Sequence, residues 1–258
     1  IEKTQALIAK LEQVKEGLLH DLLTRGVDEN GELRPSAEEA PELYKESALG
    51  LIPSGWNVLT LCDATSDPIC YGIVQVGTHV NDGVPVLAIK DLLGDFATGI
   101  HRADPAVDRP YARSRVRPGD VLLSIKGTIG RVGVVPDHFA GNISRDIARL
   151  RPAPDVRSGY LCHFLRSADG KRTLTAAQVG TTRAELSIGP LKRICIPVPP
   201  LKEQDALHAA LAPYIESIAK ENDVLTMLQR IKSGLMDDLL TGHVRVTTLL
   251  DREPAEAN

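Results

Sequence analysis

Two stretches of this chain carry nearly the same helical sequence. LEQVKEGLLHDLLTRGVD spans residues 11–28, and LQRIKSGLMDDLLTGHVR spans residues 228–245. At an offset of 217, without gaps, nine of the seventeen positions from Leu11 to Val27 are identical. Gly17 and Gly234 are one identical pair. Because an interior glycine costs a helix about 1 kcal/mol against alanine, its repetition predicts a shared packing or bending demand rather than a chance likeness of two leucine-rich helices.

The repeat predicts two long helices with matching apolar stripes. The first helix is expected to end near Thr24, where Arg25-Gly26 is typical of a glycine C-cap. The second is expected over 201–240, and Pro213 should kink or interrupt it. Each helix must bury its stripe, so we expect the two to pack as an antiparallel coiled coil. The residues expected in that contact are Leu11, Leu18, Leu22, Leu228, Leu235 and Leu239.

The sequence between the helices predicts short strands and little helix. Residues 28–41 are polar and rich in turn formers, which indicates a linker, and a short element is expected around 43–50. Strands are expected within 52–61, 84–92, 146–152 and 192–200, and a pair of strands joined by a glycine turn is expected within 120–136. Helical spacing is found within 158–177. The fold class is therefore α+β, because the strands are too short and irregularly connected for a doubly wound sheet.

Composition narrows the class of protein. The 258 residues suit one large domain or two smaller ones, and 43% hydrophobic residues can fill a core. Cys62, Cys70, Cys162 and Cys195 form no CxxC pair, which argues against a zinc ribbon or a disulfide framework and fits a cytoplasmic location. We find neither a membrane-length apolar run nor a signal peptide. The first residue already lies in a helical pattern, so the chain is expected to be a fragment.

The net charge of −4 conceals an uneven distribution. Residues 71–200 contain 18 Lys and Arg against 11 Asp and Glu, a balance of +7, and the remaining residues carry −11. This asymmetry indicates a basic module at 71–200 flanked by acidic segments. The alternative is that these charges only keep the protein surface solvated. Arginines of the module cluster at Arg109, Arg113, Arg115 and Arg117, and others lie in or beside glycine-rich or strand segments, at Arg131, Arg145, Arg149 and Arg183.

Motifs for catalysis are not evident in the sequence. GTIGRVG, residues 127–133, resembles a phosphate loop, but no Lys-Ser pair follows, and the next residues favour a strand over a helix N-terminus. The seven histidines lie apart and form no local ligand motif. We also find no methyltransferase motif, no nuclease-like acidic cluster, and neither HExxH nor GxSxG. The chain is expected to be non-catalytic.

The ordered set of motifs resembles the specificity subunit of type I restriction–modification systems. The resemblance extends over nearly the whole chain, and no single motif carries it alone. The motifs are KEGLLHDLLTRGVDENGEL (15–33), IPSGW (52–56), GDVLLSIKGTIGRVGVVP (119–136), NISRDIARLRP (142–152), IPVPPLKEQ (196–204) and KSGLMDDLLTG (232–242).

The resemblance implies one target recognition domain between spacer helices. The implied boundaries are a partial spacer helix at 1–26, a linker at 27–51, the recognition domain at 52–200, the distal spacer helix at 201–242 and a tail at 243–258. A full subunit of this family has two recognition domains, so the chain resembles a C-terminal half or a half-sized subunit. Pro213 departs from the smooth helix that the family implies.

The resemblance also implies a function in DNA reading. Double-stranded DNA would be read at one half of a bipartite site, and the helices would dock modification subunits and, through them, restriction subunits. A homodimer or a complementary half subunit is a further partner. No cofactor is expected in this chain, and S-adenosylmethionine would belong to the modification subunit. The residues expected to contact DNA are Tyr71, Gln75, Lys126, Arg131, Arg145, Thr181, Thr182 and Arg183, of which Tyr71 and Gln75 are drawn from the resemblance alone.

Two alternatives stay open at this point. The chain could be the specificity part of a fused restriction–methyltransferase polypeptide, which a methyltransferase motif in a preceding region would reveal. It could instead be a coiled-coil interaction protein without a DNA role. The basic module at 71–200 argues against this second alternative. The sequence does not give the target bases.

Overall fold

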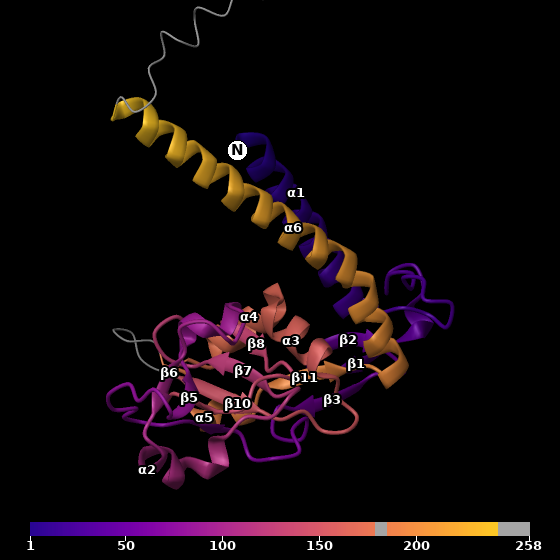
Figure 1. The fold of residues 1–258 in the computed structure, drawn as a ribbon. Coiled ribbons are helices and arrows are strands. Elements are labelled where there is room, and N and C mark those ends of the chain that lie inside the picture. The colour runs from indigo at the N-terminus through magenta and orange to yellow at the C-terminus, as the bar shows by residue number, and fades with distance from the viewer. Residues whose placement is uncertain (179–184, 242–258) are drawn as a thin grey trace, which may run out of the picture. The chain divides into compact units, whose positions relative to one another are not determined.

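The protein consists of two compact units, as seen in a computed structural model that describes residues 1–178 and 185–241. The helical unit contains Ile1–Gly17 and the chain from Leu211 onward, and the globular unit is Leu18–Ala210. Helix α1 (Glu2–Thr24) and helix α6 (Leu201–Leu240) each have residues in both units (Figure 1). No helix among the described residues combines the length and apolarity needed to cross a membrane.

Among its described residues, the globular unit contains short strands in four small sheets. A four-stranded sheet has the order β4-β10-β7-β8, a three-stranded sheet has the order β6-β5-β9, and β11-β3 and β1-β2 form two pairs. All pairings are antiparallel except β5 with β9. The strands are β1 (Tyr44–Ser47), β2 (Gly50–Pro53), β3 (Asn57–Thr60), β4 (Cys70–Tyr71), β5 (Val84–Leu87), β6 (His101–Ala103), β7 (Val121–Ser124), β8 (Val132–Val134), β9 (Asn142–Ile143), β10 (Ile147–Leu150) and β11 (Cys195–Val198).

Short helices connect and cover these strands. The α-helices are α2 (Pro105–Asp108), α3 (Ser158–Arg166), α4 (Ala168–Ala176) and α5 (Ile188–Lys192), and the 3-10 helices are η1 (Pro41–Leu43), η2 (Ile89–Leu93) and η3 (Arg109–Ser114). The helical spacing within 158–177 thus belongs to two helices, because Ser167 ends α3 and caps α4 by accepting a hydrogen bond from the Gly170 N–H.

The four-stranded sheet is covered on both faces. All four residues of β7 are buried, although a half-exposed strand would alternate. Helix α3 packs against β7 and β8, while Leu122 and Ile147 belong to an apolar cluster that also contains Leu87, Val116 and Phe139. The glycine turn predicted within 120–136 is confirmed, since β7 and β8 pair and the turn between them contains Gly127 and Gly130 at positive φ.

Three motifs that are distant in the sequence meet at the end of α1. Gly26 has φ +66, and its N–H donates to the Leu22 carbonyl, which confirms the predicted glycine C-cap. A Cβ at Gly26 would lie 2.6 Å from the ring of Trp56 in the IPSGW motif, and Trp56 is fully buried. Glu203 of the LKEQ motif accepts the Val27 N–H at 2.9 Å. The repeated helix end is therefore held by the segments that enter and leave the globular unit.

The neighbouring Gln204 fixes the first turn of α6. This side chain is fully buried. Its amide donates to the carbonyls of Asp155 and Pro199, both at 2.8 Å, and its oxygen accepts the Arg157 N–H at 2.7 Å. A buried amide needs partners for its donors and its acceptor. These three hydrogen bonds therefore hold the backbone at Asp155, Arg157 and Pro199 against the start of α6. The LKEQ motif thus has a structural explanation that does not require catalysis.

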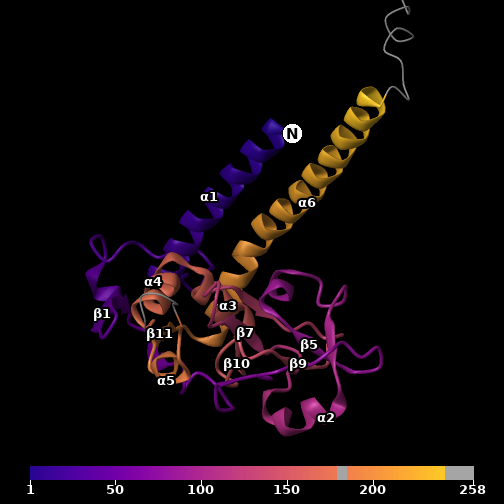
Figure 2. The same cartoon turned by 90° about the vertical axis from the view of Figure 1, so that its left-hand side faces the viewer.

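The helical unit contains two helical segments that run in opposite directions (Figures 1 and 2). On α1, Thr4, Leu11 and Lys15 are partly buried, and on α6, Ile218, Leu225 and Leu228 are partly buried. These positions follow the three- and four-residue spacing expected of facing stripes. The antiparallel direction agrees with the prediction, whereas a continuous coiled coil stays a prediction.

The six leucines predicted to pack have different environments. Leu22 is buried, and Leu11, Leu18 and Leu228 are partly buried. Leu235 is 58% exposed and Leu239 is 45% exposed, and every residue from Gln229 to Thr241 is exposed. The last three turns of α6 therefore present an uncovered apolar stripe.

Three expectations differ from the structure. Pro213 does not interrupt α6, which is one helix of 40 residues. A Cβ at Gly17 or at Gly234 would meet no atom within 4 Å, so no packing contact within the described chain explains the repeated glycine. The segment 27–51, predicted as a linker, contains strand β1 and the start of β2.

Candidate nucleic-acid interface

Basic side chains gather at one end of the four-stranded sheet. Ile147 of β10 pairs with Ser124 of β7. Lys126 lies two residues after Ser124 and Arg145 two residues before Ile147, so antiparallel pairing brings both to the same sheet end. The Ile125 N–H donates to the Asp146 carbonyl at 2.8 Å and extends this pairing.

The glycine turn after β7 presents Arg131 at the same end. The Ser124 N–H donates to the Arg131 carbonyl, and the Arg131 N–H donates to the Ser124 hydroxyl, at 2.9 and 2.8 Å. That hydroxyl donates in turn to the Thr128 carbonyl at 2.5 Å. Gly127 and Gly130 supply the positive φ values that such a tight turn requires. Buried Ser124 therefore fixes a basic loop, which is how rigid scaffolds present contact residues.

The basic residues at the sheet end are only lightly neutralised. Lys126 pairs with Glu185 at 2.9 Å, and Arg145 pairs with Asp146 at 3.6 Å. All four side chains are between 34% and 53% exposed, so these pairs are weak and easily exchanged for other anions. Arg131 has no side-chain partner within the described residues. This end of the sheet can therefore bind phosphates.

The other predicted contact residues are less closely grouped. The Arg145 N–H donates to the Ile73 carbonyl at 2.9 Å, and Gln75, which is exposed, follows two residues later. Tyr71 is 40% exposed and lies on edge strand β4, opposite Ala148. The predicted contacts Thr181, Thr182 and Arg183 lie outside the described residues.

A second basic region was only partly visible in the sequence. Arg113, Arg115 and Arg117 line one cavity together with Arg149 and Arg151. The alternation Arg113-x-Arg115-x-Arg117 was a signal for the first three residues. No signal showed that Arg149-x-Arg151 of the next strand would join them, because that depends on the sheet topology.

Buried polar groups hold this arginine segment in place. The Asn142 amide donates to Asp108 at 2.8 Å, and the Ser114 hydroxyl donates to the Asn142 oxygen at 2.8 Å. Asp108, Ser114 and Asn142 are all fully buried. Arg115 pairs with Asp108, and the hydrogen bonds that its guanidinium donates to this carboxylate raise the Arg115 pKa above its ordinary value. The network ties η3 to β9, and Arg115 joins it through its ion pair with Asp108.

The sequence comparisons agree with this reading of the module. A family model described as the type I restriction modification DNA specificity domain matches residues 114–230, which span β7 through β11 and most of α6. The chain is 28% identical over 231 residues to the type I restriction enzyme EcoBI specificity subunit of Escherichia coli, covering 80% of this chain and 49% of that protein.

Over residues 114–230 the chain is therefore similar to the DNA specificity domain of type I restriction–modification systems. The chain is also 24% identical to the MjaVIII specificity subunit of Methanocaldococcus jannaschii, covering 94% of this chain and 56% of that protein. Its fold resembles the HsdS subunit of Thermoanaerobacter tengcongensis, with a TM-score of 0.56, 21% identity, and coverage of 92% of this chain and 52% of that one. The chain spans about half the length of the curated relatives it matches.

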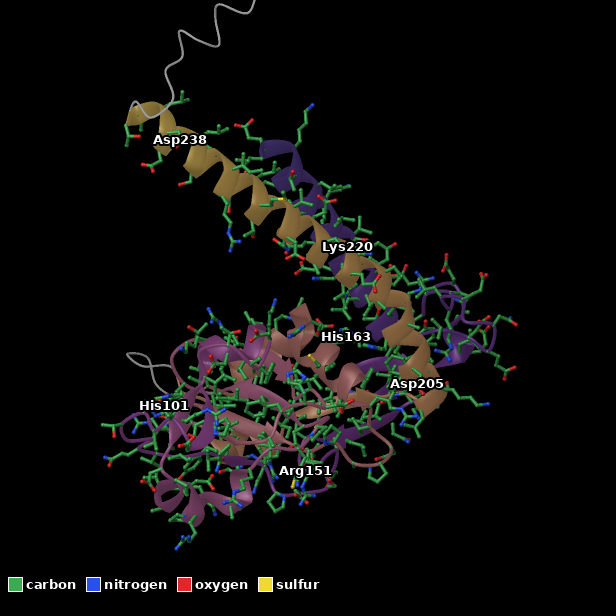
Figure 3. The ribbon with its side chains drawn as sticks, in the orientation of Figure 1. His101, Arg151, His163, Asp205, Lys220 and Asp238 are labelled. Carbon is green, nitrogen blue, oxygen red and sulfur yellow. The ribbon has the colours of Figure 1, made fainter. Side chains whose placement is uncertain are left out.

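The described part of the chain has no grouping of metal ligands. Among residues 1–178 and 185–241, no cluster of three or more His, Cys, Asp and Glu side chains could hold a metal ion. His163, labelled in Figure 3, has a ring nitrogen 3.0 Å from a ring nitrogen of His208.

Proposed function

We propose that this chain is the DNA-reading part of a type I restriction–modification specificity subunit. It reads one half of a bipartite target by contacts to base edges in the major groove, assisted by contacts to phosphates. The observation that carries the proposal is the match of the DNA specificity domain to residues 114–230. Lys126, Arg131 and Arg145, grouped at one sheet end within that span, support it.

The chain acts by binding, and the chemistry resides in its partners. The helices dock modification subunits and, through them, restriction subunits. S-adenosylmethionine is bound by the modification subunit, and methyl transfer requires a target adenine flipped out by that partner. A DNA substrate implies a cytoplasmic location. The uncovered stripe at Leu235 and Leu239 supports a role of α6 in assembly, because exposed apolar stripes mark interaction sites.

The assembly determines the symmetry of the DNA site. One recognition domain reads one half site, and a bipartite target requires two readers at fixed spacing. A homodimer through the helices would read a palindromic target, whereas a complementary half subunit would give an asymmetric one. We expect weak DNA binding by the chain alone and much tighter binding in complex with modification subunits.

A salt titration of DNA binding tests the proposed surface. Fluorescence anisotropy of the complex with modification subunits is measured for K126Q/R131Q/R145Q, because each lost phosphate contact lowers the slope of log K against log salt by about 0.9. The control K45Q/K171Q/R172Q removes the same charge at exposed positions elsewhere. An unchanged affinity and slope in the first variant would show that this sheet end does not contact DNA.

Methylome sequencing tests the function itself. Cells carrying the intact system should methylate adenines in a bipartite motif, and deletion of the gene for this chain should abolish that motif. Methylation that persists without the chain would exclude it as a specificity subunit. If residues preceding the chain in its natural protein contain a methyltransferase motif instead of a second reader, the fused polypeptide is the correct alternative.

A further inference from the structure

An arginine cavity lies apart from the basic sheet end. It has a volume of about 440 Å³ and is lined by Arg113, Arg115, Arg117, Arg149 and Arg151, with Asp67 as the one carboxylate that lines it among the residues described. Figure 3 shows the labelled Arg151 on the side of the globular unit opposite His163 of α3. Lys126 and Arg145 lie beyond the Ser124–Ile147 pair, whereas Arg151 follows the Leu150–Val121 pair at the other end of the same strands. The two basic regions therefore occupy opposite ends of one sheet.

Two of the five arginines already have strong partners. Arg115 pairs with fully buried Asp108. Arg151 pairs with Asp120, which is 1% exposed, through two hydrogen bonds of 2.8 Å, and also with Asp67. The hydrogen bonds that Arg151 donates to Asp120 raise the Arg151 pKa above its ordinary value. These two guanidinium groups form part of the cavity wall.

The remaining three arginines lack such partners. Arg113 and Arg117 are exposed, and neither guanidinium has a hydrogen bond or ion pair to the described residues. Arg149 is only 4% exposed, yet its contacts are long, 3.4 Å to Asp67 and 3.3 Å to the Pro68 carbonyl. Its buried Nε has no partner within the described residues. A nearly buried guanidinium with weak partners is costly, because burial removes the water that would otherwise solvate the charge.

An adjoining cavity enlarges the opening beside Arg149. It has a volume of about 600 Å³ and shares Asp67, Arg113 and Arg149 with the arginine cavity. Its other lining residues include Cys70, Tyr71 and Lys192. The Cys70 thiol donates to the Arg113 carbonyl at 3.6 Å, which connects edge strand β4 to the arginine segment. A ligand at Arg113 and Arg149 is thus reached from the sheet edge that carries Tyr71.

The chemistry of the cavity favours a phosphoryl group. Guanidinium forks match phosphate oxygens in bidentate geometry, and arginine is preferred over lysine where this planar recognition is required. Arg113, Arg117 and Arg149 together offer more N–H donors than one acceptor oxygen can bind. A phosphate supplies several acceptor oxygens for them. An isolated carboxylate supplies only two oxygens.

We propose that the cavity formed by Arg113, Arg117 and Arg149 binds a phosphoryl group, and that in the assembled complex this group is a backbone phosphate of the DNA. This second half of the proposal rests on the proposed function. It makes the cavity an anchor that sets the register of the duplex beside the bases read, because phosphate contacts position a protein on DNA.

Two probes test the phosphoryl group and its source separately. The variant R113Q/R117Q alters only exposed side chains and should fold, and R149K keeps the charge of Arg149 but removes its fork. The control K171Q/R172Q removes two charges at exposed positions of α4. Thermal unfolding is measured with inorganic phosphate against chloride at constant ionic strength, and DNA binding of the complex is measured as a function of salt.

Inorganic phosphate should raise the Tm of the wild type and of the control, but not of R113Q/R117Q, and R149K should reduce the rise. For DNA, R113Q/R117Q should lower the salt slope by about 0.9 for one lost phosphate. No change in either readout overturns the cavity as a phosphoryl site. If R113Q/R117Q loses the rise in Tm with phosphate but keeps the salt slope of DNA binding, the assignment to DNA is overturned. If this variant instead binds the modification subunit more weakly at an unchanged salt slope, the cavity would be assigned to an acidic protein surface.

The same experiment separates this inference from the proposed function. A wild-type complex without salt-dependent DNA binding refutes the proposed function and the DNA half of the inference. The phosphate response of the wild type against R113Q/R117Q still decides whether the cavity takes a phosphoryl group.

Discussion

Glu203 is the residue whose replacement should most directly weaken the junction at the end of α1. Its carboxylate accepts the buried Val27 N–H at 2.9 Å and pairs with Arg34, with a second oxygen at 3.1 Å from that guanidinium. Glu203 is 8% exposed and Arg34 is 20% exposed, so solvent screens the pair only slightly. Replacing Glu203 by alanine leaves both donors without an acceptor.

The expected loss of stability follows from these contacts. A buried N–H without a partner costs about 1–3 kcal/mol, and hydrogen bonds to a charged group contribute about 1.5–3 kcal/mol. Because Arg34 is partly exposed and regains water, we expect E203A to lose about 3 kcal/mol rather than the full sum. E203Q keeps an acceptor for the Val27 N–H and should lose about 1.5 kcal/mol.

Urea unfolding, followed by circular dichroism and by Trp56 fluorescence, measures these losses. Coincident transitions by the two probes are required before the midpoints are converted to free energies. The double variant R34A/E203A should give a coupling energy of about 1–2 kcal/mol with the single variants. A loss below about 1 kcal/mol for E203A, or no coupling to Arg34, would refute the role assigned to the junction.

Three further changes have expected outcomes. G133A should lower the free energy of unfolding by about 2 kcal/mol, because the new Cβ would lie 2.6 Å from the Leu92 carbonyl oxygen. The control G55A, whose Cβ would meet no atom within 4 Å, should leave this free energy unchanged. Equal urea midpoints for the two variants would contradict this prediction. Burial raises the pKa of the Cys162 thiol, so Cys162 should react with a thiol reagent more than about tenfold slower than exposed Cys62, as followed by mass spectrometry; equal rates would show that α3 opens readily. Backbone hydrogen bonds from Thr98 and Ala97 lower the Asp95 pKa from 3.8 to about 2, so the contribution of Asp95 to stability is present above pH 3.8 and is lost as the pH falls toward 2. The difference in free energy of unfolding between wild type and D95N should therefore narrow over that range. A difference that stays constant with pH would contradict the assignment.

The long helices were predictable because their signals are local and repeated. The apolar stripe and the Arg25-Gly26 end determined α1 to within a residue. Of the two outcomes expected at Pro213, a kink or an interruption, the interruption does not occur, since the helix continues through it. A proline removes one hydrogen bond and does not end a helix that has enough turns on either side. The glycine turn between β7 and β8 was also local and was predicted.

A short element was expected around 43–50, but it could not be assigned as the β1–β2 hairpin because its sequence lacks an alternating apolar pattern. Leu49 and Leu51 are exposed, and only Tyr44, Ile52 and Pro53 of its strands are buried. A strand without a clean buried face gives no period-two signal. The candidate site shows the same limit. Lys126 and Arg145 could be named from the sequence, but their meeting at one sheet end depends on the pairing of β7 with β10.

The burial of Arg149 could not be inferred from the sequence at all. An arginine in a strand is usually solvated. Arg149 is buried because it lies in β10, the strand next to β7, whose four residues are all buried. Its neighbour Arg151 finds Asp120 and Asp67, which are 31 and 84 residues away in sequence. Charge partners at such separations follow from topology rather than from any local pattern.

The pairing of β3 with β11 has a consequence for how such a chain can change over time. Asn57 pairs with Val198 and Thr60 with Cys195, so the chain enters and leaves most of the globular unit through two adjacent strands. Everything from Leu61 to Ile194 is thus an insertion between fixed ends. A genetic crossover near these two strands would exchange the entire inserted segment at once, while Gly26, Trp56 and Glu203 keep their contacts. New binding preferences could therefore be acquired by recombination in one event, without redesign of the helices on either side.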